Sequence, residues 1–421
     1  MADIDRARVA ELAEERLDFR FKAVPAEAWG STVAEYLAGG PLLDGLGTPL
    51  LTLDAGALAH NLAAMAAWCA QAGVGLAPHG KTSMAPALWQ RHLDAGAVAI
   101  TFANLPQVRV GRAFGVGRIH LANTLLDPAG LRWISAELAA DPDFRFACWA
   151  DSVQSVALMS EALRGAPAPV DVCVELGAAG GRTGCRTLPE AVEVARAVHA
   201  APGLRLAGVS GYEGPVGPDA SPASVAAVTG YLRTMAELYR QLDGDGLLDE
   251  VDRVWVTAGG SAFFDTVAEE LAPLAGPRTA VVVRAGAYLA HDDGFYRGIS
   301  PFGRRGAGEP LRAALHGWSR VLSAPEPGLA LLDAGKRDLP FDLGLPVPQL
   351  VRGGKVLDGA SLSALNDQHG YLRGADVAVG DVVRLGISHP CTAFDRWNLI
   401  PVLDDADAAS PRVVDLVRTF F

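Results

Sequence analysis

Short apolar and β-branched runs alternate with alanine- and leucine-rich stretches of helical spacing through the middle of the chain. This alternation predicts repeated strand–helix units. The predicted strands are residues 75–78, 98–102, 118–123, 145–150, 170–176, 206–212, 253–258 and 280–286. Predicted helices at residues 84–96, 105–115, 128–140, 152–165, 188–200 and 222–244 are long enough to connect parallel strands. Eight strands with helical returns over about 250 residues predict a (β/α)8 TIM barrel in preference to a doubly wound sheet.

The hydrophobic pattern changes after the eighth predicted strand. Residues 296–310 form a connection rich in Gly, Pro and Arg, and the short apolar runs beyond it are separated by Gly, Pro and Asp. These runs predict a C-terminal domain of mostly antiparallel β-strands. The run at residues 49–54 precedes the barrel, and we expect it to join that domain. The expected division is an N-terminal segment (1–54) packed on the β domain, the barrel (55–295) and the β domain (296–421).

The composition is that of a folded, acidic protein. A chain of 421 residues exceeds what one hydrophobic core usually supports, which also favours two domains. Hydrophobic residues make up 50% of the chain and charged residues 20%, which excludes disorder as its main property. The 48 acidic and 36 basic residues give a net charge of −12. Nucleic acid and anionic membrane surfaces would be repelled, so we expect neither as a partner.

Cysteine usage and the N-terminus bear on localisation. Five scattered cysteines do not resemble a disulfide framework and favour a reducing cytoplasm. Residues 1–22 are densely charged, so we expect no signal peptide or anchor there. Residues 55–80 lack Asp, Glu, Lys and Arg and are long enough for a membrane span. Polar residues and glycines interrupt them, so we predict a helix followed by a buried strand.

Lys81 directly follows the first predicted barrel strand. The active sites of such barrels lie at the carboxyl ends of the strands. The lysine follows the tight turn at residues 78–80 in an otherwise uncharged stretch, so we expect it to be partly desolvated. Desolvation would lower its pKa, as imine formation requires. A lysine in an ordinary surface loop is the alternative that its position leaves open.

A second candidate feature follows the seventh and eighth predicted strands, where barrels place phosphate sites. Residues 257–261 (TAGGS) follow the seventh strand, and residues 284–288 (RAGAY) follow the eighth. Backbone amides freed by glycine, together with two hydroxyls, can hold a phosphate without a basic side chain. A plain tight turn is the alternative.

A third candidate feature is the His-x-Cys pair of His389 and Cys391, which follows the apolar run at residues 380–387. Side chains at positions i and i+2 of an extended segment point to the same side, so both could bind one ion. Nitrogen and sulfur ligands favour zinc, and two protein ligands leave coordination positions open for a substrate. A buried cysteine beside a hydrogen-bonded histidine is the alternative.

Taken together, these segments resemble the pyridoxal 5'-phosphate (PLP) enzymes of the alanine racemase fold, or fold-type III. Within that fold they resemble the D-serine dehydratase / D-threonine aldolase group, and most of all its bacterial D-serine dehydratase-like amino-acid deaminases. Residues 77–86 (APHGKTSMAP) resemble the group's Schiff-base lysine segment, residues 102–123 the next two strands, and residues 388–397 (SHPCTAFDRW) the metal segment. The resemblance spans most of the chain.

The resemblance implies a cofactor site built from residues that lie far apart in the sequence. Lys81 would hold PLP as an imine, and Arg182 would lie near the ring hydroxyl. Tyr212 and Tyr288 match tyrosines on the ring or phosphate side of the cofactor. The phosphate would be held by four residues of the loop after the seventh strand, Thr257, Gly259, Gly260 and Ser261.

The metal segment discriminates between reactions by resemblance. Aldolases of the group resemble His-x-Asp there, whereas dehydratases and deaminases resemble His-x-Cys, so His389 and Cys391 favour elimination and imply Zn2+ or another divalent cation. Racemases require a second tyrosine from the β domain, and the context of Tyr371 does not match that motif. An acidic residue precedes His369 in the group, whereas this chain has Gln368, which leaves the role of His369 open.

The resemblance therefore implies a PLP- and zinc-dependent lyase. Its substrate would be a D-β-hydroxy amino acid such as D-serine or D-threonine, and its products a 2-oxo acid and ammonia. Lys81 would remove the Cα proton, while the metal stabilises the departing hydroxide. Retro-aldol cleavage to glycine and an aldehyde, as in D-threonine aldolase, is the nearest alternative. Two further alternatives are racemisation and PLP binding without catalysis. The family likeness also implies a homodimer.

Overall fold

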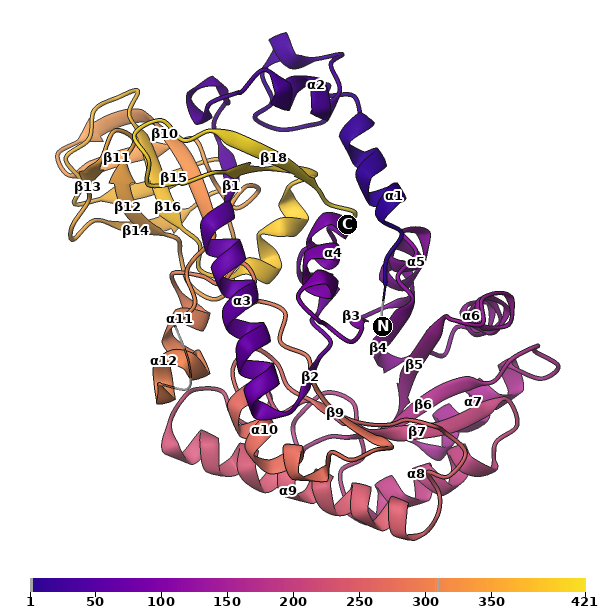
Figure 1. Cartoon of the computed structure of the whole chain (residues 1–421). Coiled ribbons are helices and arrows are strands. Elements are labelled where there is room, and N and C mark those ends of the chain that lie inside the picture. Colours follow the sequence, from indigo (N-terminus) through magenta and orange to yellow (C-terminus); the bar gives the residue numbers. More distant parts are fainter. Residues whose placement is uncertain (1–2, 307, 309) are drawn as a thin grey trace.

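The computed structural model describes residues 3–421 apart from 307 and 309 (Figure 1). Within these residues, eight parallel strands form a sheet in the order β2-β9-β8-β7-β6-β5-β4-β3. A bridge between His79 and Thr101 joins its two ends, so the sheet closes into a barrel. The predicted TIM barrel is thus confirmed. Its strands are β2 (Gly75–Leu76), β3 (Ile100–Phe102), β4 (Arg118–Thr124), β5 (Arg145–Ala150), β6 (Val170–Leu176), β7 (Leu204–Gly211), β8 (Val254–Ala258) and β9 (Thr279–Val283).

Helices surround the barrel and return the chain from one strand to the next (Figure 1). They are α3 (Ala55–Ala72), α4 (Pro86–Asp94), α5 (Leu105–Ala113), α6 (Pro128–Ala140), α7 (Val153–Ala162), α8 (Leu188–Ala200), α9 (Pro222–Gly244) and α10 (Phe264–Leu271). Polar side chains accept hydrogen bonds from first-turn amides and define where most of them begin, namely Asp54, Asn104, Asp127, Ser152, Thr187 and Ser221. Among the described residues, no helix combines the length and apolar character needed to cross a bilayer.

The C-terminal part of the described chain forms a mostly antiparallel sheet. Its strand order is β13-β12-β16-β10-β1-β17-β18, with β11, β14 and β15 attached beside β10. The bounds are β10 (Leu315–Glu326), β11 (Leu329–Leu332), β12 (Val347–Val351), β13 (Lys355–Val356), β14 (Ser361–Leu365), β15 (Gly370–Arg373), β16 (Val382–Gly386), β17 (Leu399–Leu403) and β18 (Val413–Arg418). The early strand β1 (Leu50–Asp54) lies between β10 and β17 and leads directly into α3.

Short helices complete the molecule. The α-helices are α1 (Arg6–Ala10), α2 (Val33–Ala38), α11 (Phe295–Ile299) and α12 (Pro301–Arg305). The 3-10 turns are η1 (Glu11–Glu14), η2 (Ala26–Ala28), η3 (Leu43–Gly45), η4 (Gly80–Thr82), η5 (Ala272–Leu274), η6 (Pro390–Thr392) and η7 (Phe394–Arg396). Two of these turns, η4 after β2 and η6 after β16, carry the candidate lysine and cysteine.

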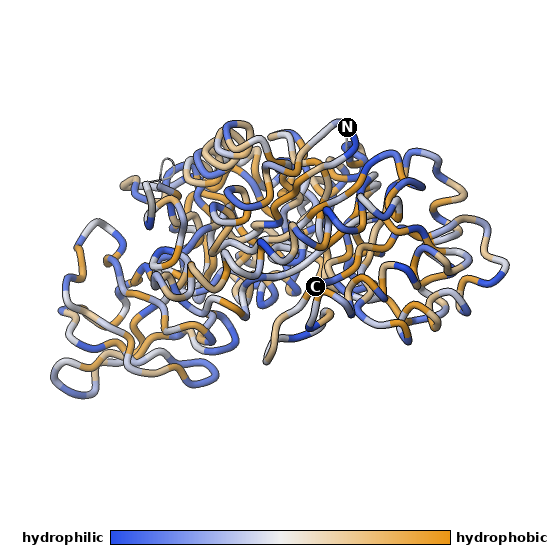
Figure 2. Tube along the Cα trace, turned by 90° about the horizontal axis from the view of Figure 1, so that it is seen from below, coloured by the Kyte–Doolittle hydropathy of each residue, from blue (hydrophilic) through white to orange (hydrophobic). Residues whose placement is uncertain are grey.

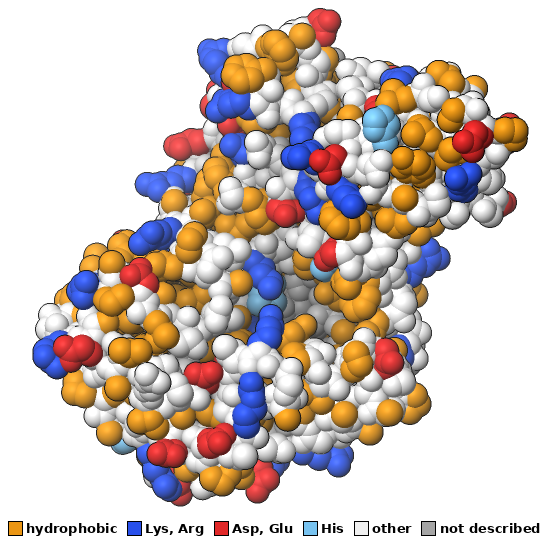
Figure 3. All heavy atoms as spheres, turned by 180° about the vertical axis from the view of Figure 1, so that it is seen from behind, with side chains coloured by type: hydrophobic (Ala, Val, Ile, Leu, Met, Phe, Trp, Pro, Cys, Tyr) orange, Lys and Arg blue, Asp and Glu red, His pale blue; other side chains and the backbone are white. Residues whose placement is uncertain are grey.

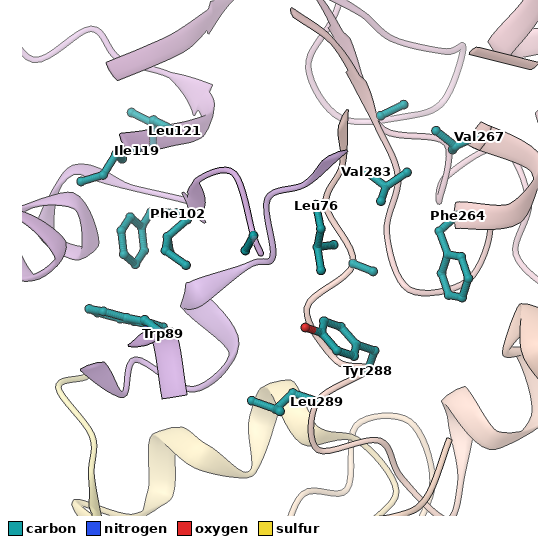
Figure 4. Packing of buried hydrophobic residues seen from close by; sticks show 14 of the residues in the cluster. Leu76, Trp89, Phe102, Ile119, Leu121, Phe264, Val267, Val283, Tyr288 and Leu289 are labelled. Carbon is teal, nitrogen blue, oxygen red and sulfur yellow. The ribbon is translucent and has the colours of Figure 1, made fainter. Parts of the chain in front are cut away.

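One large cluster of buried side chains runs through both parts of the molecule. It includes Trp89 of α4 and Phe102 of β3, whose ring centroids lie 5.0 Å apart in an edge-to-face contact (Figure 4). The same cluster contains Leu385 and Ile387, in β16 and directly after it. In Figure 2 the hydrophobic stretches concentrate inside the trace, while hydrophilic stretches are frequent on the outer loops. Because protein interiors are densely packed, this shared core holds the barrel and the C-terminal sheet in a fixed relative position.

Candidate active site

The candidate lysine and the candidate metal pair meet in space. Lys81 lies in η4 and Cys391 in η6. The hydroxyl oxygen of Thr82 is 3.6 Å from the sulfur of Cys391, across a separation of 309 residues in the chain. Cys391 is also close enough to Lys81 to raise the pKa of its amine, against the effect of burial. A turn at the carboxyl end of the first barrel strand therefore faces a turn of the C-terminal part. Figure 3 shows a hollow between the two lobes, with Lys, Arg and His side chains on its wall.

The surroundings of Lys81 lower its pKa. Burial is the largest cause, because it disfavours the charged amine. The positive charges of Arg182 and Arg284 lower the pKa further, whereas Cys391 partly opposes them. A larger fraction of the amine is therefore neutral near physiological pH than for an exposed lysine. The desolvation that we predicted for this residue is present.

Arg182, whose charge lowers the pKa of Lys81, lies against the ring of Tyr212. The Arg182 guanidinium carbon is 4.7 Å from the centroid of the Tyr212 ring, within the range of a cation–π contact. The same ring lies 3.0 Å from the point that a Cβ at position 260 would occupy. Only glycine fits there without displacing the ring, so the loop after β8 can approach Tyr212 closely. Arg182, Tyr212 and Gly260 are thus neighbours, and their roles at the cofactor stay a prediction.

The polar groups that we expected to hold a phosphate are largely engaged within the protein. The amides of Gly259 and Gly260 donate to the buried carboxylate of Glu213, at 2.9 and 2.8 Å. The Thr257 hydroxyl donates to the carbonyl of Val282 at 2.9 Å and accepts a bond from Arg284 at 2.7 Å.

Ser261 connects this loop to the loop after β9. Its hydroxyl oxygen accepts a hydrogen bond from the amide of Ala287 at 3.1 Å. The two loops predicted to form the phosphate site therefore lie against each other. The phosphate roles of residues 257–261 stay a prediction.

Tyr288 is buried, and its hydroxyl lies 2.7 Å from Nδ1 of His92 in α4. Burial raises the pKa of this tyrosine. Figure 4 shows the ring packed among core residues close to Leu289. The hydroxyl is thus occupied within the barrel wall, and a role of Tyr288 beside the cofactor stays a prediction.

Buried polar atoms near Lys81 or near its neighbours Arg182 and Arg284 lack partners in the described part of the chain. They are Nδ1 of His79, Nε of Arg284 and Oε2 of Glu175. Burial raises the pKa of Glu175 to about 7, although its bond from Thr183 opposes this. Unpaired buried polar atoms are costly, so they suggest a polar ligand that supplies the missing bonds. A pyridine ring with polar substituents and a phosphate fits this set of groups, and an amine is at hand in Lys81.

His389 is held by an aspartate that sequence analysis missed. Nδ1 of His389 lies 2.7 Å from Oδ2 of Asp342, and the Thr392 hydroxyl donates to Oδ1 of Asp342 at 2.6 Å. Burial alone would lower the pKa of His389, but contacts with Cys391 and Asp342 raise it to about 9. A carboxylate on one ring nitrogen of a histidine is the usual support for a metal on the other nitrogen.

The two candidate ligands fit a cation with open positions. Among the described residues, no group of three or more His, Cys, Asp and Glu side chains is placed to hold a metal. His389 and Cys391 could provide two ligands, and water or substrate would have to fill the remaining positions of a bound ion. The imidazole and thiol donors suit zinc.

Tyr296, Asp342 and Glu213 are further members of this region that the sequence did not reveal. The ring of Tyr296 lies 6.0 Å from that of His389, and its pKa is raised by burial and by Cys391 and Tyr212. These residues belong to no motif, and their importance follows only from contacts between distant segments. No sequence signal for Asp342 or Glu213 was available.

The residues around His369 make hydrogen bonds within the C-terminal part of the chain. Gln368 donates a hydrogen bond to Asp338 at 2.9 Å. The hydroxyl of Tyr371 accepts one from Asn366 at 3.0 Å. These bonds give Gln368 and Tyr371 structural partners in the C-terminal sheet.

Comparison with known proteins identifies the family. A family model described as alanine racemase, N-terminal domain, matches residues 53–269, just over half of the chain. A second, described as putative serine dehydratase domain, matches residues 314–403. The chain belongs to the alanine racemase N-terminal domain family. The predictions of a fold-type III PLP enzyme and of a PLP-dependent lyase are thus confirmed.

Relatives within the alanine racemase family align over most of the chain. A D-threonine aldolase from Arthrobacter sp. is 29% identical over 367 residues, covering 85% of this chain and 89% of the relative. A 3-hydroxy-D-aspartate aldolase from Paracoccus denitrificans is 27% identical over 363 residues, covering 83% and 87%. The solved D-threonine aldolase of Filomicrobium marinum is 25% identical with a TM-score of 0.76, covering 90% and 97%. A D-threo-3-hydroxyaspartate dehydratase from Delftia sp., 23% identical with a TM-score of 0.70, covers 90% and 99% and shares the fold.

Proposed function

We propose that the chain removes water from a D-β-hydroxy amino acid such as D-serine or D-threonine, giving a 2-oxo acid and ammonia. The curated relatives are all named for D-configured β-hydroxy amino acids, which supports the substrate class. The observation that carries the reaction type is the cysteine at position 391, whose sulfur lies 3.6 Å from the hydroxyl of Thr82, the residue directly after Lys81.

The cofactor site that we propose is built around Lys81. Lys81 would attach PLP, Arg182 and Tyr212 would flank it, and Ser261 with the neighbouring loop after β9 would face its phosphate. When bound, PLP supplies an electron sink that stabilises negative charge at the substrate Cα. The unpaired buried atoms near Lys81 support a polar occupant of this kind.

Lys81 is the residue to which we assign proton transfer. Its Nζ would accept the Cα proton, because burial and the nearby guanidinium groups lower its pKa and favour the neutral amine. The overall reaction removes this proton and the β-hydroxyl as water. The released enamine then hydrolyses to the 2-oxo acid and ammonia.

The metal site that we propose uses Nε2 of His389 and the sulfur of Cys391. Oδ2 of Asp342 lies 2.7 Å from Nδ1 of His389, which would leave the other ring nitrogen free to bind a cation. A bound zinc ion would act as a Lewis acid on the β-hydroxyl, which is otherwise a poor leaving group. Position 391 favours elimination because the group's aldolases resemble His-x-Asp at this point.

Retro-aldol cleavage is the second candidate function. It is favoured by the curated relatives, which are named aldolases and are 27–29% identical to this chain. In that reaction the Cα–Cβ bond breaks, and the products are glycine and an aldehyde. Both reactions use the same substrate class, so the products separate them.

Product analysis with D-threonine tests the proposal. We expect holoenzyme supplied with zinc to form 2-oxobutanoate and ammonia in equal amounts, and a chelator or Cys391→Ala to suppress both while bound PLP remains. Cys148→Ala, which removes a cysteine of β5 that is not a candidate metal ligand, serves as the control. If glycine and acetaldehyde are the main products, the enzyme is an aldolase and the proposed elimination is wrong. Full activity without metal would reject the Lewis-acid role of the metal.

We further propose a cytoplasmic homodimer divided into an N-terminal segment (1–54), a PLP-binding barrel (55–295) and a metal-carrying β domain (296–421). The pairing of β1 with β10 and β17 supports the first part of this division. Light scattering should give about twice the 43.9 kDa of one chain. A mass of one chain at working concentration would contradict the dimer.

A further inference from the structure

A second cavity opens at the amino ends of the barrel strands, at the opposite end from Lys81. Its volume is about 390 Å³. Three arginines on its wall begin or nearly begin a strand, namely Arg118 in β4, Arg145 in β5 and Arg205 in β7. Arg253, directly before β8, also lines it. The mouth of the barrel is thus rich in guanidinium groups.

The strand period explains why these side chains share one cavity. Residues i and i+2 of a strand point to the same side. Arg118 and His120 are such a pair, and so are Arg253 and Trp255, and all four line the cavity. The rings of His120 and Trp255 are stacked, with centroids 5.5 Å apart and planes 1° from parallel. Each of these two strands therefore contributes a cation at the mouth and a ring deeper in the barrel.

Part of the positive charge is already neutralised. Arg205 forms an ion pair with Asp171 at 2.7 Å. Arg145 donates to the carbonyl oxygens of Pro142 and Phe144. The remaining acids on the wall are Glu250, which lies 3.9 Å from Nδ1 of His199, and Asp252.

Arg118 and Arg253 differ from Arg205 and Arg145 in having no such partners among the described residues. Within residues 3–306, 308 and 310–421, neither has an ion pair or a side-chain hydrogen bond. Burial lowers the pKa of Arg118, and the like charges of Arg253 and Arg145 lower it further. Three guanidinium groups therefore repel one another across the cavity, and a bound anion would relieve this repulsion.

The inner end of the cavity presents a hydrogen-bond donor. The indole N–H of Trp149 donates to Nε2 of His120 at 2.8 Å. Indole can only donate, so Nε2 is the acceptor, and the ring proton of neutral His120 is on Nδ1. Burial lowers the pKa of His120 well below its usual range and keeps it neutral. Nδ1 has no partner among the described residues, although His120 is fully buried.

We propose that this cavity binds a small anion carrying a carboxylate or phosphate group. Arg118 and Arg253 would bind the charged group at the mouth, and the Nδ1–H of His120 would bind an acceptor atom at the inner end. All three offer only donors, and oxyanions offer only acceptors. The volume suits a small organic anion rather than a polymer. Arg118 and Arg253 lie at the far end of the barrel from Lys81, whereas His120 at the inner end is close enough to Arg284 for the two to interact electrostatically. The proposal does not depend on the reaction assigned to the catalytic groups.

Isothermal titration calorimetry on PLP-saturated holoenzyme tests the site, with inorganic phosphate and succinate as the two probes. The ionic strength is kept constant, because salt screens the attraction between an anion and the arginines. We expect saturable binding of at least one anion, and the preferred probe identifies the charged group. Arg118→Ala and Arg253→Ala should each weaken binding about tenfold, the effect of one charge-assisted hydrogen bond. Arg240→Ala, which removes an exposed charge on α9, should leave it unchanged.

A fluorescence measurement keeps the proposal testable should an arginine variant fold poorly. Trp255 lies on the cavity wall, so anion binding should change tryptophan emission in the wild type. Trp255→Phe keeps a ring beside His120, and it should lose most of this change while the calorimetric binding persists. The proposal would be overturned if neither anion bound saturably, or if Arg240→Ala weakened anion binding as much as the two cavity variants. It would also be overturned if Trp255→Phe kept the full fluorescence change.

Discussion

The local environment of Lys81 makes its amine suited to bind a cofactor and to carry a proton. Burial and two guanidinium groups favour the neutral amine, as described above. We expect Lys81→Ala to remove the near-visible absorbance of the lysine-bound cofactor and to lower kcat about a thousandfold. Lys355→Ala, which removes an exposed lysine paired with Asp376, is the matched control. A Lys81→Ala protein that keeps this absorbance would refute the lysine assignment.

Asp342 should act through His389 on metal affinity. Asp342→Asn keeps the size of the side chain but removes the charge that faces Nδ1 of His389. We expect zinc affinity, measured by competition with a chromogenic chelator, to fall by about ten- to a hundredfold. Asp376→Asn, in an exposed ion pair, should have no effect. Equal zinc affinity in Asp342→Asn and the wild type would remove Asp342 from the metal site.

Glu175 should make stability depend on pH. Burial raises its pKa to about 7 from an ordinary value of 4.5, against the effects of Thr183, Arg284 and Arg182, while Asp151 adds to the rise. Between these pH values the folded protein keeps a proton that the unfolded chain has released, so the free energy of unfolding falls as pH rises.

Glu175→Gln removes this titration, and the melting temperature of the variant should therefore fall less than that of the wild type between about pH 4.5 and pH 7. Thermal unfolding at a series of pH values measures the difference. Parallel curves for the two proteins would show that Glu175 does not titrate in this range.

Individual residues were predictable where they belong to a local motif. Lys81 follows a strand, and His389 and Cys391 are two positions apart in an extended segment. The residues next to them in the sequence were therefore enough to indicate a functional role. Asp342 and Glu213 act only through contacts with segments about fifty residues away, and no local pattern encodes such contacts.

Among elements, the contact between the loops after β2 and β9 determines the shape of the cofactor site. A Cβ at position 286 would lie 2.7 Å from the Cβ of His79 and 2.9 Å from its carbonyl oxygen. Gly286→Ala must therefore push the two loops apart. We expect PLP affinity to fall about tenfold or more, since small displacements in a site are costly. Gly298→Ala, where no atom lies within 4 Å, is the control. Unchanged PLP affinity in Gly286→Ala would place the cofactor elsewhere.

The barrel strands were predictable because parallel strands are buried on both faces and form continuous apolar runs. The ends of these strands were less predictable. The eighth run extends to residue 286, but β9 ends at Val283, because residues 284–286 turn into the loop that meets β2. Strands β12 to β15 were not predicted individually, because their exposed positions interrupt the apolar pattern.

At the scale of the whole molecule, the proposed active site is assembled from both halves of the chain. Motifs predicted a lysine in the barrel and a metal pair in the C-terminal domain, and the family resemblance implied that both act on one substrate. The structure brings the turns η4 and η6 together, with Thr82 beside Cys391. The continuous core explains why this contact is stable, because Phe102 and Ile387 belong to one packed cluster.

The most direct test is a crystal structure of the PLP- and zinc-loaded protein with anomalous data at the zinc edge. The account predicts a zinc peak bonded to Nε2 of His389 and the sulfur of Cys391, in the cavity that holds the cofactor on Lys81. A metal bound elsewhere, or a cofactor on a different lysine, would contradict it.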